Sequence, residues 1–68
     1  NVINISTVDM KGLVKISIFD LQGKLIYSNS INNTDEQITI PLQKINSGNY
    51  LIKLENGNKI VSKRFIVK

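Results

Sequence analysis

The chain has 68 residues and a net charge of +4, from nine Lys and Arg against five Asp and Glu. That length suits one small domain that relies on its apolar core, because a chain without Cys or His forms neither a disulfide nor a structural zinc site. The same absences exclude a thiol nucleophile and an imidazole base, and no apolar run approaches the ~20 residues of a membrane-spanning helix.

Two alternating segments open the chain and predict strands, with a polar connection over Thr7–Gly12 between them. The predicted strands are Asn1–Ser6 and Leu13–Phe19. The side chains expected to point inward are those of Ile3, Ile5, Val14, Ile16 and Ile18, and those expected outward are Lys15 and Ser17.

A turn over Asp20–Gly23 is predicted next, because Gly23 is free to adopt a left-handed conformation there. It leads into a partner strand over Lys24–Ser28. We expect Leu25 and Tyr27 to share one face of that strand.

The middle of the chain predicts a loop and then a fourth strand. Asn29–Glu36 is rich in Asn and reads as the loop, with Ile31 as its one side chain in the core. Gln37–Leu42 alternates again and places Ile38, Ile40 and Leu42 on one face. Pro41 has no N–H to donate, so this strand should lie at a sheet edge or end there.

Residues Gln43–Asn49 are expected to turn, with Ile45 as a buried plug. The run Asn46-Ser47-Gly48-Asn49-Tyr50 has the spacing of a tyrosine corner, in which a Tyr at the start of a strand bonds back across a turn. The alternative is an ordinary glycine turn followed by a buried Tyr.

The chain ends in a predicted β-hairpin with strands over Tyr50–Glu55 and Lys59–Val67. Asn56-Gly57 between them suits the two positive φ angles of a type I′ turn. The inner faces are expected to carry Tyr50, Ile52, Leu54, Val61, Phe65 and Val67. Lys63 interrupts that face, which predicts a bulge or a lip position near Ser62–Lys63. The basic last strand is either a structural edge or an address that a partner reads.

No segment shows a period of 3.6 residues, and β-branched residues dominate the apolar runs. Short, closely linked strands favour antiparallel pairing, because parallel strands need long crossover connections. The sequence therefore predicts an all-β sandwich or a small barrel with six to seven short strands.

The polar residues give little material for catalysis. Asp35-Glu36 is the only adjacent pair of carboxylates, and neighbours in a loop point in different directions. The chain has no spaced loop of oxygen ligands for calcium, and its glycines belong to separate turns instead of a phosphate-binding loop. We expect no enzyme activity, no cofactor and no metal.

Nucleic-acid binding is also not expected. Single-strand binders combine a basic groove with exposed aromatic platforms. The four aromatic residues, Phe19, Tyr27, Tyr50 and Phe65, all fall at positions that look inward or anchor a turn.

Three blocks of the sequence, in this order, resemble the type A C-terminal sorting domain of the type IX (Por) secretion system of Bacteroidetes. They are Ile16–Ile26 (ISIFDLQGKLI), Ile45–Leu54 (INSGNYLIKL) and Gly57–Lys68 (GNKIVSKRFIVK). The family usually opens with a Tyr-Pro-Asn-Pro-like segment. This chain begins at about the strand that follows it, so residues 1–68 are expected to be a single sorting domain without that first segment.

The resemblance implies a small immunoglobulin-like antiparallel β-sandwich that acts as a non-catalytic secretion signal. The domain would follow N-terminal cargo domains of the same polypeptide and cross the periplasm in transit. The outer-membrane translocon would recognise it, and a sortase-like peptidase would remove it as the cargo is attached to the cell surface or released. Weak self-association through exposed edge strands is also expected.

We expect the translocon to recognise a patch on the closing hairpin. Its candidate residues are Gly48, Tyr50, Gly57, Lys59, Lys63, Arg64, Phe65, Val67 and Lys68. The alternative for each Lys is that it is an ordinary surface charge that keeps the domain soluble. The alternative for the whole chain is an immunoglobulin-like accessory module of a secreted protein, either glycan-binding or a spacer.

Overall fold

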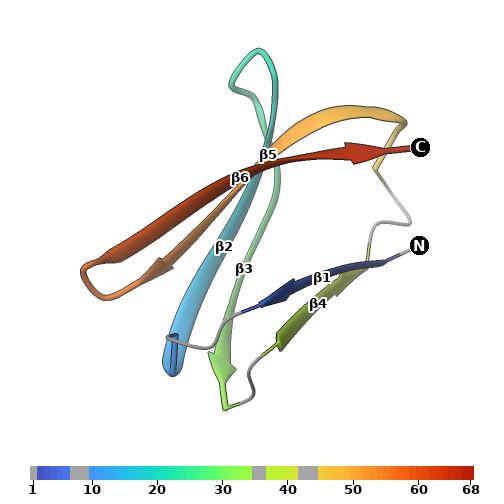
Figure 1. Cartoon of the computed structure of the whole chain (residues 1–68). Coiled ribbons are helices and arrows are strands. Elements are labelled where there is room, and N and C mark those ends of the chain that lie inside the picture. The colour runs from blue at the N-terminus through green and yellow to red at the C-terminus, as the bar shows by residue number, and fades with distance from the viewer. Residues whose placement is uncertain (1, 7–9, 35–36, 42–44) are drawn as a thin grey trace.

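The computed structural model describes residues 2–6, 10–34, 37–41 and 45–68, and six strands lie in these ranges (Figure 1). The strands are β1 (Val2–Ser6), β2 (Gly12–Asp20), β3 (Leu25–Asn33), β4 (Gln37–Pro41), β5 (Gly48–Asn56) and β6 (Lys59–Val67). β1 and β4 form a two-stranded sheet, and the other four form a sheet in the order β3-β2-β5-β6. Every pairing is antiparallel, which confirms the prediction of a small all-β sandwich. Within the described ranges there is no helix with the length and hydropathy that crossing a membrane requires.

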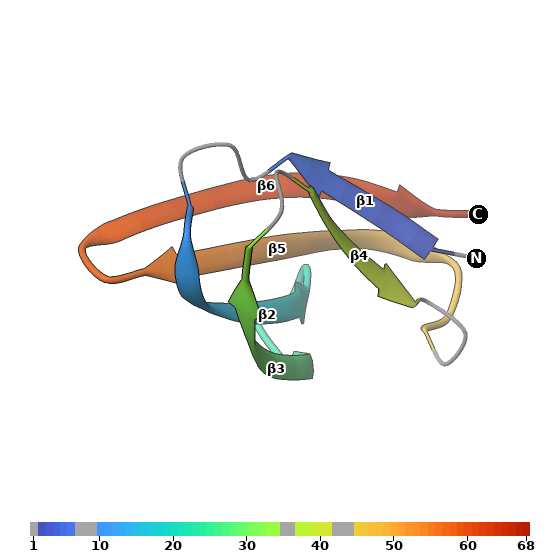
Figure 2. The same cartoon turned by 90° about the horizontal axis from the view of Figure 1, so that it is seen from below.

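The core lies between the two sheets, and the two-stranded sheet covers one face of the larger one (Figure 2). Alternation along each strand sends every second side chain to this face. The buried apolar residues are Ile5, Met10, Val14, Ile16, Ile18, Ile38, Ile40, Tyr50, Ile52, Leu54 and Val67. Ile3, Tyr27, Ile31, Ile45 and Phe65 are half-buried and pack against them. The inward positions predicted for β1, β2, β4 and β5 are thus confirmed, while Leu42 lies outside the described residues.

The turn between β2 and β3 forms as the sequence predicts. Gly23 has a φ of 90°, and its N–H donates to the carbonyl oxygen of Asp20 at 3.1 Å. The side chain of Asp20 accepts two further N–H groups, from Gln22 and Lys24, each at 2.9 Å. One carboxylate therefore satisfies backbone donors on both sides of the turn.

β3 is longer than the sequence predicts, because Asn29–Asn33 continues the strand instead of forming a loop. The pairing of β3 with β2 also shifts by one residue: Ile18 faces Tyr27, but Phe19 faces Leu25. Ile26 is the extra residue of this bulge. Because cross-strand partners share a face, Leu25 lies with Phe19 on the outer face, and the prediction that it shares a face with Tyr27 is wrong.

Two asparagine side chains hold the segment that leads into β2. Asn33 Nδ2 donates to the carbonyl oxygen of Met10 at 2.6 Å. Asn56 Nδ2 donates to the carbonyl oxygens of Lys11 and Leu13 at 3.0 and 2.8 Å. The side chain of Met10, which the sequence did not mark as core, is buried at this point.

Ser17 is also buried, although its outward position predicted exposure. β2 is a central strand, and on the outer face Ser17 has Ser28 of β3 on one side and Lys53 of β5 on the other. The short side chain of Ser17 is thus flanked on both sides within the sheet, and only one of its neighbours, Lys53, is long enough to lie over it.

Candidate recognition surface

The closing hairpin pairs without a register shift from Gly48 and Val67 at one end to Asn56 and Lys59 at the other. Of the two alternatives predicted near Ser62–Lys63, the bulge is therefore wrong, and the lip position fits the structure. Lys63 sits directly opposite Ile52 on the core-facing side of the sheet and is exposed there. Figure 1 shows that the turn end of the hairpin extends past β1 and β4, and on this side of β6 Lys59, Val61 and Lys63 are all exposed.

The hairpin turn differs from the predicted type I′ turn. Asn56 and Lys59 are paired, so the two loop residues are Gly57 and Asn58. Gly57 has a φ of 60°, and among the described residues no residue other than glycine has a positive φ. Glycine at the first loop position followed by a negative φ is the sign pattern of a type II′ turn, which also matches the twist of a hairpin.

The tyrosine corner is present at the start of β5. The hydroxyl of Tyr50 donates to the backbone carbonyl oxygen of Asn46 at 2.5 Å. Gly48 lies between them with a φ of 151°, and a Cβ there would be 3.8 Å from the Tyr50 ring. The Tyr50 ring packs on Phe65, its cross-strand partner, with ring centroids 5.8 Å apart.

The predicted site residues fall into two groups. Gly48, Tyr50, Phe65 and Val67 gather at one end of the hairpin, where Tyr50 and Val67 are buried and Phe65 is half-buried. They build the shape of this end. Gly57 lies at the opposite end of β5, so the structure does not bring both glycine turns into one patch.

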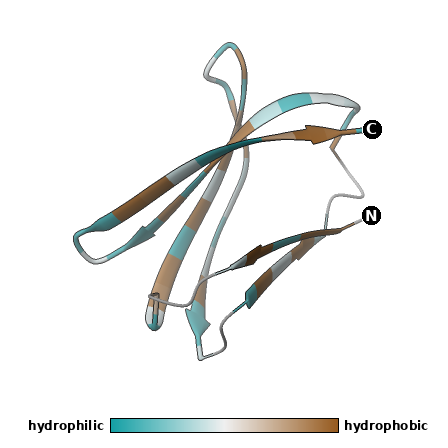
Figure 3. Cartoon of the chain, viewed as in Figure 1, coloured by the Kyte–Doolittle hydropathy of each residue, from teal (hydrophilic) through white to brown (hydrophobic). Residues whose placement is uncertain are grey.

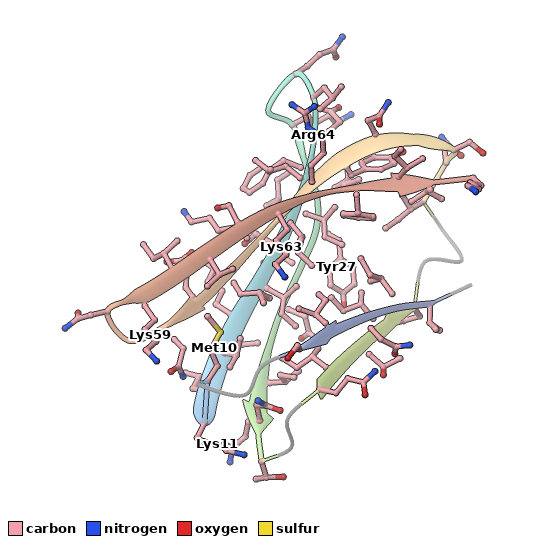
Figure 4. The ribbon with its side chains drawn as sticks, viewed as in Figure 1. Met10, Lys11, Tyr27, Lys59, Lys63 and Arg64 are labelled. Atoms are coloured by element: carbon pink, nitrogen blue, oxygen red, sulfur yellow. The ribbon has the colours of Figure 1, made fainter. Side chains whose placement is uncertain are left out.

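The second group is basic and exposed, and it is divided between the two faces of the sheet. Lys59 and Lys63 are opposite Asn56 and Ile52, on the core-facing side. Arg64 is opposite Leu51 and therefore on the outer face, and Figure 4 shows Arg64 and Lys63 projecting from β6 in different directions. Lys68 follows the strand and is exposed. Figure 3 shows the hydrophilic middle of β6 between hydrophobic stretches.

Groups that could support catalysis or metal binding are sparse in the described part of the chain. There is no cluster of three or more His, Cys, Asp or Glu side chains that could hold a metal ion. The only ion pair among these residues joins Lys53 Nζ to Glu55 Oε1 at 3.6 Å. The Asp35-Glu36 pair lies outside the described residues.

The aromatic residues are mostly committed to packing. Tyr50 belongs to the core, and Tyr27 and Phe65 pack against it. Phe19 does not point inward, because its register partners Leu51 and Leu25 place it on the outer face, half-buried, directly before the Asp20–Gly23 turn. The exposed apolar side chains near Phe19 were not predicted from the sequence. Leu51 and Ile66 occupy outward positions of alternating strands, and an apolar residue out of phase with the core is the signal that marks them.

A comparison with models of protein families matches residues 1–68 to the model described as the secretion system C-terminal sorting domain. None of the curated proteins compared with the chain matches it.

Proposed function

This chain belongs to the family of secretion system C-terminal sorting domains, and from that membership we propose how it serves the polypeptide that carries it. The domain is a sorting signal of the type IX system, which implies export to the cell surface or the extracellular space. The family match over residues 1–68 carries this conclusion. The family is not known as catalytic, and we infer that the domain acts through its surface alone.

The proposed route passes through the periplasm. The cargo domains and the sorting domain cross the inner membrane, and the outer-membrane translocon then recognises the folded domain. A sortase-like peptidase removes it while the cargo is attached to the surface or released. A sandwich with short turns supports such a role, because a rigid surface can be recognised without the entropy cost of ordering it.

Within the closing hairpin, we assign different parts to the two groups of residues. Tyr50, Phe65 and Val67 are buried or half-buried and set the shape of the hairpin, together with the Gly48 and Gly57 turns. The exposed cations Lys59, Lys63, Arg64 and Lys68 are the candidates for direct contact with the translocon.

A reporter fusion tests the proposed function. A soluble reporter with an N-terminal export signal is joined to residues 1–68 and expressed in a bacterium that has a type IX system. We expect the reporter at the cell surface or in the medium, and in the periplasm when the sorting domain is omitted. Equal surface delivery with and without the domain would overturn the proposal.

The control for folding is Ile16→Asp, which puts a charge at a position that is 1% exposed. If recognition needs the folded sandwich, this fusion should stay in the periplasm. Deleting Phe65–Lys68 is less informative, because it also removes the buried Val67 and so confounds unfolding with lost recognition.

A further inference from the structure

The outer face of the four-stranded sheet carries a row of apolar side chains that the core does not use. Register places Leu25, Phe19 and Leu51 side by side on β3, β2 and β5. Arg64 continues the row on β6, and Ile66 lies two residues farther along the same face of that strand. We call these five residues the outer row. Leu25, Leu51 and Ile66 are 51%, 39% and 65% exposed.

The outer row is confined to one end of this face. The next row across the sheet is polar and consists of Ser28, Ser17, Lys53 and Ser62. The outer row lies beside the turn between β2 and β3, where Leu21 is a further exposed apolar side chain. Contiguous apolar side chains on adjacent strands, bordered by polar ones, are typical of an interaction surface.

The charge of the outer row points to the chemistry of a partner. Arg64 is exposed at the β6 end of the row, and within the described ranges no carboxylate is paired with it. Among the described residues, the ion pair on this face joins Lys53 and Glu55, both outside the outer row. A guanidinium binds a carboxylate through two parallel hydrogen bonds, so it provides orientation as well as charge.

We propose that the outer row is the surface by which this domain docks on a protein of the export machinery. The partner surface is apolar and carries a carboxylate opposite Arg64. A protein fits better than an anionic lipid surface. The row itself has one cation among apolar side chains. Of the other cations on this face, Lys53 is paired with Glu55 and Lys15 lies opposite the same carboxylate, whereas binding to lipid is favoured by several uncompensated cations together. The proposal rests on the proposed function, because that function supplies the partner.

The test uses the reporter fusion with two variants of the outer row. Leu25→Ser combined with Leu51→Ser removes apolar surface, and Arg64→Glu reverses the charge. We expect each to lower surface delivery by about tenfold or more, as for residues at the centre of an interface. Thermal unfolding of the variant chains shows that they are folded. Arg64→Glu keeps the test valid if the leucine pair unfolds the domain, because the Arg64 side chain is exposed.

Matched controls lie on the same sheet. Leu13→Ser combined with Ile60→Ser removes two exposed apolar side chains from the outer face outside the row. Lys15→Glu reverses an exposed charge on the same face of the sheet but outside the outer row. We expect both to deliver the reporter within about twofold of the parent fusion. A parent fusion that is not exported contradicts the proposed function. Export of the parent together with normal export of both outer-row variants overturns this inference alone.

Binding to vesicles of phosphatidylglycerol and phosphatidylcholine separates the two partner classes. We expect the 68-residue chain and its Arg64→Glu variant to sediment equally with these vesicles. Vesicle binding by the parent chain that both outer-row variants abolish would assign the row to a membrane and overturn the protein partner.

Discussion

Hydrogen bonds from side chains to the backbone hold the points at which strands of this domain begin. The hydroxyl of Tyr50 bonds to Asn46 before β5, and the amide of Asn33 bonds to Met10 before β2. Asn56 donates twice to the backbone around the start of β2. Each such bond contributes about 1 kcal/mol to stability. In a small domain without a disulfide, bonds of this size are a substantial fraction of the total.

The tyrosine corner predicts a loss of stability when the hydroxyl oxygen of Tyr50 is removed. Tyr50→Phe keeps the ring and its packing on Phe65 but leaves the carbonyl of Asn46 without this donor. We expect the free energy of unfolding in urea to fall by about 1 kcal/mol. Tyr27→Phe is the matched control, because the Tyr27 hydroxyl has no hydrogen-bond partner among the described residues. Equal effects of the two substitutions would contradict a stabilising corner.

At the residue scale, alternation predicted the inward side chains of β2 and β5, because burial on a pleated strand has a period of two. Burial that depends on neighbouring strands was not predictable in this way. Ser17 is flanked on both sides within the sheet, and Met10 is buried where a long-range bond from Asn33 fixes the backbone. Neither effect leaves a local pattern in the sequence.

The hairpin between β5 and β6 shows how a tertiary contact decides which two residues form the loop of a turn. Asn56-Gly57 fits a type I′ turn locally, yet Asn56 is the last paired residue of β5. Its amide donates to the carbonyl oxygens of Lys11 and Leu13, which are more than 40 residues away in the sequence. These bonds hold Asn56 in the strand, so Gly57 becomes the first loop residue.

The type II′ turn predicts that a substitution by alanine costs more stability at the first loop position than at the second. Gly57→Ala should destabilise the chain by about 1 kcal/mol, because an L-residue is strained at a φ of 60°. No atom lies within 4 Å of the added Cβ, so the expected cost is conformational and not steric. Asn58→Ala is the control and should change the midpoint of urea unfolding very little. A loss for Asn58→Ala as large as that for Gly57→Ala would indicate a positive φ at both loop positions, which is the type I′ pattern.

Strand positions were largely predictable because each strand is bounded by glycine or polar residues, and the exception is β3. Its Asn-rich end resembles a loop in composition, but it pairs with Gly12–Ile16 and so satisfies the backbone of β2. The bulge at Ile26 then turns Leu25 to the outer face. Of the candidate site, the sequence predicted the corner and the basic strand, and it passed over the outer row, which exists only once four strands are in register.

At the scale of the whole molecule, four strands are covered by two, and the coverage is uneven. Along the core-facing side of β6, Val67 is buried and Phe65 is half-buried, whereas Lys63 is exposed and Val61 is 37% exposed. β6 is also an edge strand, so its outer backbone groups have no neighbouring strand within the described sheet. An uncovered edge of this kind invites pairing with a second chain.

Lys63 is placed to prevent that pairing, because an inward-pointing charge on an edge strand opposes burial by another chain. Lys63→Val would leave four apolar side chains in succession on this side of β6, from Val61 to Val67. Burying the new valine contributes about 1.5 kcal/mol per chain, so the two valines of a dimer correspond to about a hundredfold higher association constant. Sedimentation equilibrium of the 68-residue chain over a range of concentrations measures this change. Ser62→Val adds the same side chain on the opposite face of β6 and should associate much less. Equal association of the two variants would mean that Lys63 does not protect this edge, and the charge would then remain available as a contact for the translocon alone.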